Sequence, residues 1–254
     1  VSACASSTNS IYDAFTYIRL GKADVIVTGG SEAAVCEAGV GGFNALKALS
    51  ERNDSPQTAS RPYDKDRDGF VLGEGAGCVI LEDYEHARAR GAKIYAEILG
   101  GGMTADAYHI TAPHPEGAGI TRVMKLALEE ANLKPSDIGY INTHGTSTPL
   151  GDIGEIKAIQ SVFGEEAYKV NISSTKSMTG HLLGGAGAIE SIFCVLAMHH
   201  HMAPPTINIE NLDDAVKVDV VRDVPRKLPD GPIACLNDSF GFGGHDVVLV
   251  FKSI

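Results

Sequence analysis

The sequence predicts an α/β protein, because strand patterns and helix patterns alternate along almost the whole chain. Short apolar runs rich in β-branched residues, such as Asp24–Thr28, predict buried strands. Between them lie segments with apolar residues at helical spacing, and residues 117–133 form the most amphipathic of these. Alternation of this kind is typical of layered sheets and helices.

The first elements follow from spacing and from glycine. Apolar residues recur at helical spacing from Ile11 onward, and Gly21 is expected to end that helix. A strand is predicted over 24–28, closed by Gly29 and Gly30. Residues 31–50 are then expected to form loop and short helix.

Residues 51–69 predict a long charged loop, solvated and linked by salt bridges. Its DKDRDG segment, 64–69, imitates the start of an EF-hand calcium loop. The twelfth position, however, is Gly75 where a bidentate Glu is needed, and no helix pattern frames the loop. We therefore expect no metal here. The GEGAG segment, 73–77, is expected to let two backbones pack closely.

The remainder of the chain predicts the same alternation. The expected strands are 78–81, 94–99, 138–143, 170–173, 233–236 and 247–251. The expected helices are 85–90, 117–133, a segment through 153–163, and 184–200, whose glycines and alanines would let another backbone approach. Residues 103–117 are expected as a loop, and the SFGFGG segment, 239–244, as a turn between the last two strands.

Composition excludes several classes of protein. A chain of 254 residues, 44% apolar and 21% charged, can bury a core as one large or two small domains. No apolar run reaches membrane-spanning length. The net charge of −11 disfavours nucleic acid as a partner. Five cysteines without a CxxC pair favour a reducing, cytoplasmic compartment and disfavour disulfides or structural zinc.

Cys4 lies among small residues in the first ten positions, VSACASSTNS, immediately before the first helix. A thiol at a helix start is exposed to the positive end of the helix dipole, which favours the reactive thiolate. The alternative is a buried structural cysteine, a common role for a single thiol.

Four further motifs accompany Cys4. His144 lies in THGTST, Lys176 in SSTKS, His181 in TGHLLGGAG and Phe242 in SFGFGG. Together, these five motifs in this order resemble the beta-ketoacyl-acyl-carrier-protein synthases, the condensing enzymes of fatty acid synthesis. The resemblance covers essentially the whole chain.

The resemblance implies the thiolase fold, in which two similar halves form five layers, α-β-α-β-α. The family's nucleophile lies near the middle of its chain, whereas here it is the fourth residue. The N-terminal half is therefore expected to be largely absent, with residues 1–100 ending that half and 101–254 forming the C-terminal half. We expect the missing half as a companion fragment or in a longer chain, and a homodimer whose partner lines the acyl pocket.

The implied reaction is a decarboxylative Claisen condensation that joins malonyl-acyl-carrier protein to a cysteine-bound acyl chain, as in fatty acid elongation. Cys4 would be the nucleophile, and neutral His144 and His181 would donate Nε2–H to the enolate. Lys176 would supply fixed positive charge, and the backbone N–H groups of Cys4 and Phe242 an oxyanion hole. The Phe242 ring would gate the acyl pocket.

Further roles follow from the same resemblance. Glu190 matches a carboxylate close to the lysine, although a charge or cap at a helix start is an alternative. Phe240 would pack against the thiol. Three threonines would contact the phosphopantetheine arm of the carrier protein: Thr111, Thr146 and Thr148. No cofactor is implied.

His181 stands where initiating synthases carry Asn, and HGTSTPLGD differs from the HGTGT usual in modular polyketide synthases. An elongating type II synthase is therefore preferred over a type I synthase. One departure is GFGGHD, with His245 and Asp246, where the family commonly has GFGGTN.

Because the chain is acidic overall, an acidic carrier protein would need a local basic patch on it. Lys47 and Arg52 are candidates for this patch, and the alternative is that they are ordinary surface charges. Two other functions stay open. One is an inactive, tunnel-shaping partner subunit of a condensing heterodimer, and the other a Cys/His thioester hydrolase.

Overall fold

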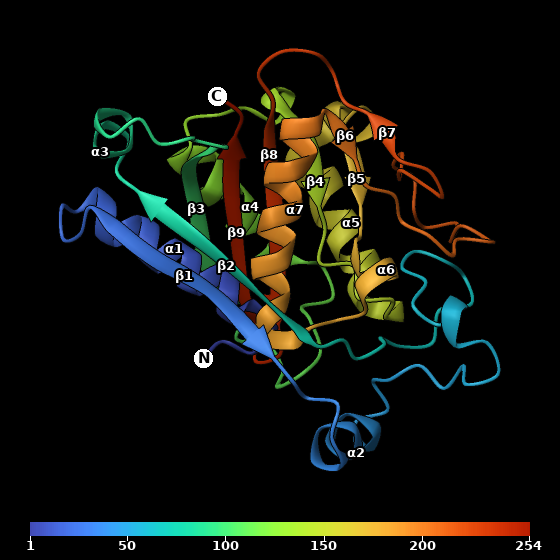
Figure 1. Ribbon diagram of the computed structural model, residues 1–254. Coiled ribbons are helices and arrows are strands. Elements are labelled where there is room, and N and C mark those ends of the chain that lie inside the picture. Colours follow the sequence, from blue (N-terminus) through green and yellow to red (C-terminus); the bar gives the residue numbers. More distant parts are fainter.

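A five-stranded mixed sheet forms the centre of the computed structural model, which describes all residues 1–254 (Figure 1). Its strands run in the order β3-β9-β8-β4-β5, with β4 parallel to both neighbours and β9 antiparallel to both of its own. The strands are β3 (Glu97–Ala105), β4 (Ile138–Asn142), β5 (Asn171–Ser173), β8 (Ala234–Gly241) and β9 (His245–Lys252). The expected domain boundary, between residues 100 and 101, falls inside β3.

Helices cover both faces of this sheet. On one face lie α4 (Ala118–Glu130) and α5 (Pro149–Phe163), whose apolar sides form the larger core with β4, β8 and β9. On the other lie α1 (Ser6–Arg19) and α7 (Ala186–His200). Beyond α1 and α7 lies a two-stranded antiparallel sheet of β1 (Val25–Glu32) and β2 (Gly75–Glu82) (Figure 1).

Smaller elements complete the chain. They are the helices α2 (Glu37–Ala45), α3 (Tyr84–Ala89) and α6 (Lys176–Thr179), and the paired strands β6 (Met202–Ala203) and β7 (Arg226–Lys227). Single 3-10 turns lie at Ala3–Ala5, Pro56–Thr58, Pro135–Asp137, Gly164–Tyr168 and Leu183–Gly185. No helix is both long and apolar enough to cross a lipid bilayer.

Four alternating layers are thus present, α-β-α-β, where the resemblance implied five. The outer face of the β1–β2 sheet carries no further layer, and it exposes 67% of Val27 and 65% of Ile80.

Three strands extend through glycines that lie beyond the ends predicted for them. β1 continues through Gly29 and Gly30, β3 through Gly100 to Ala105, and β8 to Gly241. A Cβ on Gly29 would lie 2.1 Å from the carbonyl oxygen of Gly77, and one on Gly100 would lie 2.7 Å from a backbone nitrogen of Ala131. In these strands glycine therefore permits close backbone approach and does not mark a turn.

The helix contacts expected from small residues are confirmed. A Cβ on Gly187, in the first turn of α7, would lie 1.8 Å from Thr8 Oγ1 of α1, so these helices meet at their backbones. Gly77, in the GEGAG segment, likewise approaches the backbone of Ala188.

The charged loop 51–69 is linked by salt bridges as expected, but the expectation that it is solvated is wrong at its centre. Arg61, Asp64 and Arg67 are all buried. Asp64 lies 3.5 Å from an Arg61 nitrogen, and Arg67 reaches Asp213 at 2.8 Å. Charged side chains are tolerated in the interior when each has an oppositely charged partner. These ion pairs hold the centre of the loop against the rest of the domain.

Candidate active site

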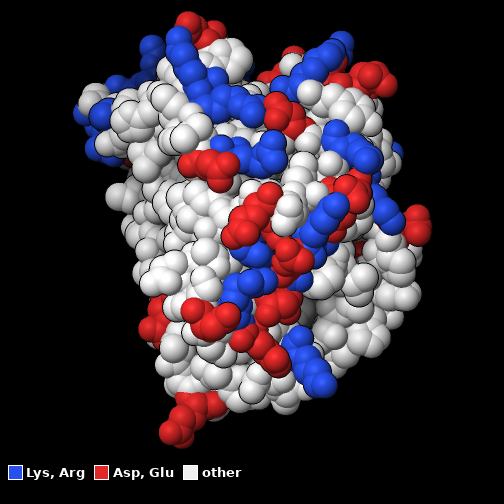
Figure 2. Space-filling view, turned by 90° about the vertical axis from the view of Figure 1, so that its right-hand side faces the viewer, with Lys and Arg blue, Asp and Glu red and all other residues white.

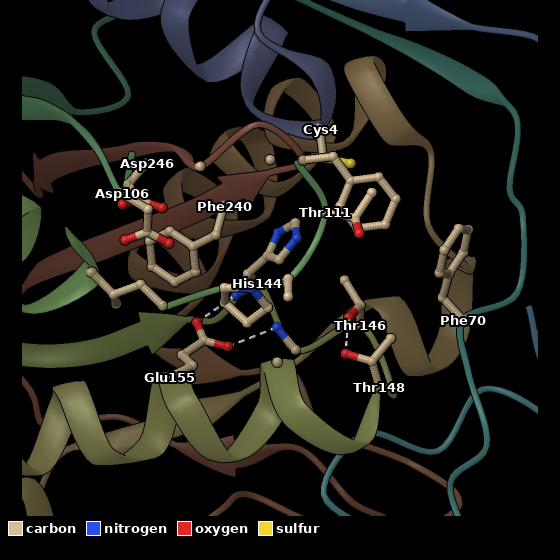
Figure 3. Close-up of a pocket in the computed structure, with 18 of the residues that line it drawn as sticks. Cys4, Phe70, Asp106, Thr111, His144, Thr146, Thr148, Glu155, Phe240 and Asp246 are labelled. Carbon is tan, nitrogen blue, oxygen red and sulfur yellow. Dashed lines mark hydrogen bonds between the residues drawn. The ribbon is translucent and has the colours of Figure 1, made fainter. Parts of the chain in front are cut away.

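Four segments that are far apart in the sequence meet at one cleft (Figure 3). Cys4 comes from the turn before α1, His144 from the loop after β4, His181 from the segment before α7, and Phe242 from the β8–β9 turn. The ends of two strands and the starts of two helices therefore bring the residues of separate motifs together, as the sequence predicts.

Cys4 is held by close backbone packing. The residue before it, Ala3, has a left-handed backbone with a φ of 48°. A Cβ on Gly241 would lie 2.7 Å from the carbonyl oxygen of Ser2 and 3.1 Å from the Cys4 nitrogen, so only glycine lets β8 reach this turn. The backbone N–H of Phe242 lowers the pKa of the Cys4 thiol and so favours its ionised form.

The expected thiolate is not favoured in the free protein. Burial raises the pKa of the Cys4 thiol to about 11, and the Phe242 N–H and the charge of Lys176 offset this only in part. The thiol packs with Phe70 and Leu183. The sequence shows that Cys4 lies at a helix start but does not show that it is buried, and burial has the larger effect on the pKa of the thiol.

His144 and His181 face each other across the cleft. Their ring centroids are 5.2 Å apart in an edge-to-face arrangement. Burial and the charge of Lys176 lower the pKa of both imidazoles well below the usual value, so both are neutral at pH 7. In each ring Nδ1 is buried and has no hydrogen-bond partner.

Lys176 and Glu190 form a buried ion pair, and the side chain of each is 1% exposed. Lys176 is the first residue of α6 and Glu190 lies in the second turn of α7. Glu190 is thus a buried partner of the lysine and not a surface cap, and Lys176 acts on the histidines through its charge.

Glu155 is a residue that the sequence reasoning missed. Its two oxygens accept hydrogen bonds from the backbone N–H groups of His144, at 2.7 Å, and Gly145, at 2.8 Å (Figure 3). Burial raises the pKa of Glu155 to about 8. The sequence does contain a signal for this role. Asp152 and Glu155 are three residues apart on α5 and therefore share a helix face. Asp152 accepts the backbone N–H groups of Ser147 and Thr148 in the same loop.

Aromatic side chains line the side of the cleft near His181. Phe70 contacts the His181 ring edge-to-face at 5.3 Å, Phe43 contacts Phe70 at 5.4 Å, and the half-buried Phe242 lies 6.4 Å from Phe43. The expectation that Phe240 packs against the thiol stays a prediction. Phe240 packs on the His144 ring at 5.7 Å, because β8 places it beside the β4 loop.

Thr111, Thr146 and Thr148 all line the cleft (Figure 3). The hydroxyls of Thr146 and Thr148 are 3.0 Å apart and hydrogen-bond each other. Thr111 comes from the segment between β3 and α4.

Lys47 and Arg52 do not line the cleft. Lys47 is exposed just after α2, whereas half-buried Arg52 donates from Nη2 to the carbonyl oxygen of Asp66 at 3.0 Å. On the face shown in Figure 2, basic and acidic side chains are interspersed. No cluster of three or more His, Cys, Asp or Glu side chains that could hold a metal ion is present.

Comparison with known proteins agrees with this geometry. The family model of the beta-ketoacyl synthase N-terminal domain matches residues 1–87, and that of the C-terminal domain matches residues 95–210. The chain belongs to the beta-ketoacyl synthase family.

Particular relatives are similar along nearly the whole chain. A 3-oxoacyl-acyl-carrier-protein synthase 2 from Synechocystis sp. is 53% identical over 252 residues, which are 99% of this chain and 60% of the relative. The synthase of the same name from Staphylococcus aureus (strain COL) is 51% identical over 253 residues, again 99% and 60%. The chain thus spans about 60% of the length of these relatives.

Solved structures show the same fold, the thiolase-like fold of the ketosynthases. A ketosynthase in complex with its type II PKS acyl-carrier protein superposes with a TM-score of 0.96 at 40% identity, covering all of this chain and 62% of that one. A beta-ketoacyl synthase from Burkholderia phymatum STM815 gives 0.93 at 40% identity, covering 100% and 60%.

Proposed function

We propose that this chain carries the catalytic residues of an elongating beta-ketoacyl-acyl-carrier-protein synthase of the type II class. The observation that carries the proposal is the meeting of one thiol, two neutral imidazoles and the Phe242 N–H in a single cleft. The substrates would be acyl and malonyl thioesters on the phosphopantetheine arm of an acyl-carrier protein.

In the first half-reaction, Sγ of Cys4 bonds to the acyl carbonyl carbon, and the bond from that carbon to the pantetheine sulfur breaks. The thiol proton leaves with the pantetheine thiol. The Phe242 N–H, with that of Cys4, would stabilise the oxyanion of the tetrahedral intermediate. Thr146 and Thr148, which line the cleft, would hydrogen-bond the arm.

In the second half-reaction, the bond between the malonyl carboxylate and its methylene carbon breaks, releasing carbon dioxide and leaving an enolate. Neutral His144 and His181 would donate Nε2–H to the enolate oxygen, and their depressed pKa values keep both in this donor form. The carbanion then bonds to the acyl carbon, the bond from that carbon to Cys4 breaks, and the thiolate regains a proton.

Several finer features belong to the same proposal. We infer a cytoplasmic homodimer in which Phe242 gates the acyl pocket, and in which Lys47 and Arg52 contribute to carrier-protein docking. The remaining part of the relatives' length would be supplied by a longer chain or a companion fragment. The 51–53% identity to proteins named 3-oxoacyl-acyl-carrier-protein synthase 2 supports the assignment as an elongating synthase.

Mass spectrometry of the full-length protein mixed with acyl-acyl-carrier protein tests the proposal. The expected result is an acyl adduct on Cys4 and, after malonyl-acyl-carrier protein is added, a β-ketoacyl product. Cys4→Ala is the control and should form no adduct. Free fatty acid as the product would indicate a thioester hydrolase, and a full-length protein without any adduct would indicate a non-catalytic subunit.

A further inference from the structure

Two carboxyl groups that the proposed chemistry does not use face each other in the wall of the cleft (Figure 3). Asp106 follows β3, and Asp246 is the second residue of β9 and is 2% exposed. A Cβ on Gly119, in the first turn of α4, would lie 2.2 Å from Asp106 Oδ1 and 2.3 Å from Asp246 Oδ2. Both oxygens therefore point at the same place.

The pair lacks a hydrogen-bond donor at its centre. Thr104 Oγ1 donates to the carbonyl oxygen of Gly119 at 3.0 Å and lies 3.3 Å from Asp246 Oδ2, so its single proton is divided between these two acceptors. Asp106 Oδ2 accepts from the backbone N–H of His114 at 2.9 Å. Asp106 Oδ1, however, is buried and has no partner. A buried acceptor without a donor is costly, so this atom requires one.

The charged and titratable groups around the pair do not supply that donor. Arg122 on α4 directs Nη2 to the carbonyl oxygen of Ala105 at 2.8 Å. His114 contributes only its backbone, His144 and Glu155 lie elsewhere along the cleft, and His245 is exposed on β9. Two ionised carboxylates in this position would repel each other without a cation between them.

The pair lies where the segment 106–114 packs against the turn 242–244 beside Cys4. The backbone N–H of Asp106 donates to the carbonyl oxygen of Gly244 at 2.9 Å, and that of Gly243 donates to Ile110 at 2.8 Å. The segment 106–114 is therefore fastened across the turn Phe242–Gly244. The same turn directs the Phe242 N–H at the thiol.

We propose that Asp246 holds a proton and donates it, directly or through one water, to Oδ1 of Asp106. This shared proton holds the segment 106–114 against the Phe242–Gly244 turn, which makes Asp246 a positioning residue for the oxyanion site. Loss of the proton leaves two like charges facing each other, so the segment loosens as the pH rises.

The electrostatics of the pair support this assignment. Burial, followed by the negative charge of Asp106, raises the pKa of Asp246 to about 7. Because the folded pKa lies above the ordinary value of 3.8, the proton stabilises the folded pair at low pH, and this stabilisation is lost as the pH rises through about 7.

Hydrogen exchange of the full-length protein without substrate tests the proposal. Peptides covering 106–117 are compared at pH 6 and pH 8 after correction for the intrinsic exchange rate. The parent should lose protection between these values, since each pH unit above a pKa lowers the protonated fraction by about tenfold. Asp246→Asn, whose amide donates at any pH, should stay protected at both.

Two further variants make the comparison specific. His114→Gln is the matched control and should respond to pH as the parent does, because only its backbone contacts the pair. Asp106→Asn removes one of the two like charges and should abolish the response, which provides a second test if Asp246→Asn does not fold.

Three results would overturn the proposal: equal protection of the parent at both pH values, an unchanged response in Asp246→Asn, or a response lost in His114→Gln. Protection restored at pH 8 by K⁺ or Mg²⁺ would also overturn it, because the pair would then bind a cation. The consequence for catalysis rests on the proposed function, but exchange of this segment does not. A failure of acyl transfer to Cys4 is therefore distinguishable from a failure of this proposal.

Discussion

Glu155 holds the backbone at His144, accepting the N–H of that residue at 2.7 Å and the N–H of Gly145 at 2.8 Å. Both donors are buried, and no other acceptor serves them. The carboxyl group of Glu155 therefore fixes the backbone position of His144 at the end of β4.

Glu155→Gln should impair the enzyme through this backbone contact. An amide offers only one acceptor oxygen, so one buried N–H would face an NH₂ group, at a cost of about 1–3 kcal/mol in the free energy of unfolding. The condensation rate should fall by roughly 10²-fold, as expected for a displaced catalytic group. Urea unfolding and steady-state kinetics measure the two effects, and a Gln variant with parental values of both would contradict the role.

The same variant should change the pH dependence of stability. Burial raises the pKa of Glu155 to about 8 in the folded protein, above the ordinary 4.5, so its contribution to stability is present at low pH and is lost as the pH rises through about 8. Between pH 6 and pH 9 the free energy of unfolding of Glu155→Gln should therefore decrease less than that of the parent. Urea titrations across this range compare the two slopes.

The sequence predicted the order and type of nearly all the main elements, because strand and helix periodicity survive in single segments. The predicted ends of strands were wrong where glycine is compatible both with a turn and with a closely packed strand. Gly29 and Gly100 lie inside strands and Gly241 is the last residue of β8; all three permit close packing, and only the three-dimensional contact distinguishes this from a turn. The candidate site was predictable from its motifs, whereas Glu155 and the electrostatics of Cys4 depend on burial created by distant segments.

The buried ion pair of Lys176 and Glu190 should be more sensitive to the loss of one partner than of both. Lys176→Met leaves a carboxylate in a site where each side chain is 1% exposed, and should cost about 3–5 kcal/mol of unfolding free energy. Lys176→Met combined with Glu190→Gln removes both charges and should be less destabilised than the single variant. Urea unfolding of the parent and both variants tests this, and a double variant with a lower free energy of unfolding than Lys176→Met would argue against the pairing.

The two half-reactions should separate by mutation. Cys4→Ala should lose acyl transfer but keep some decarboxylation of malonyl-acyl-carrier protein, since His144 and His181 remain. His144→Ala should lower decarboxylation by roughly 10²–10³-fold, the usual effect of removing one oxyanion donor. Release of carbon dioxide from labelled malonyl-acyl-carrier protein measures both variants, and a parental rate in His144→Ala would exclude its role as a donor.

The exposed face of the β1–β2 sheet should govern the behaviour of residues 1–254 produced alone. Val27 is 67% exposed and its cross-strand neighbour Ile80 is 65% exposed, and the free edge of β1 can pair with another strand. An apolar face of this kind associates with whatever covers it.

We therefore expect residues 1–254 alone to self-associate and not to form a soluble monomer with one cooperative melting transition. Replacing Val27 and Ile80 together by Lys should shift the sedimentation profile towards monomer, because the charges oppose burial of this face. Val224→Lys is the matched control, since Val224 is 69% exposed but lies in the segment between β6 and β7. Sedimentation velocity decides the matter: a monomeric parent, or an equal shift in the control, would show that this face does not drive the association.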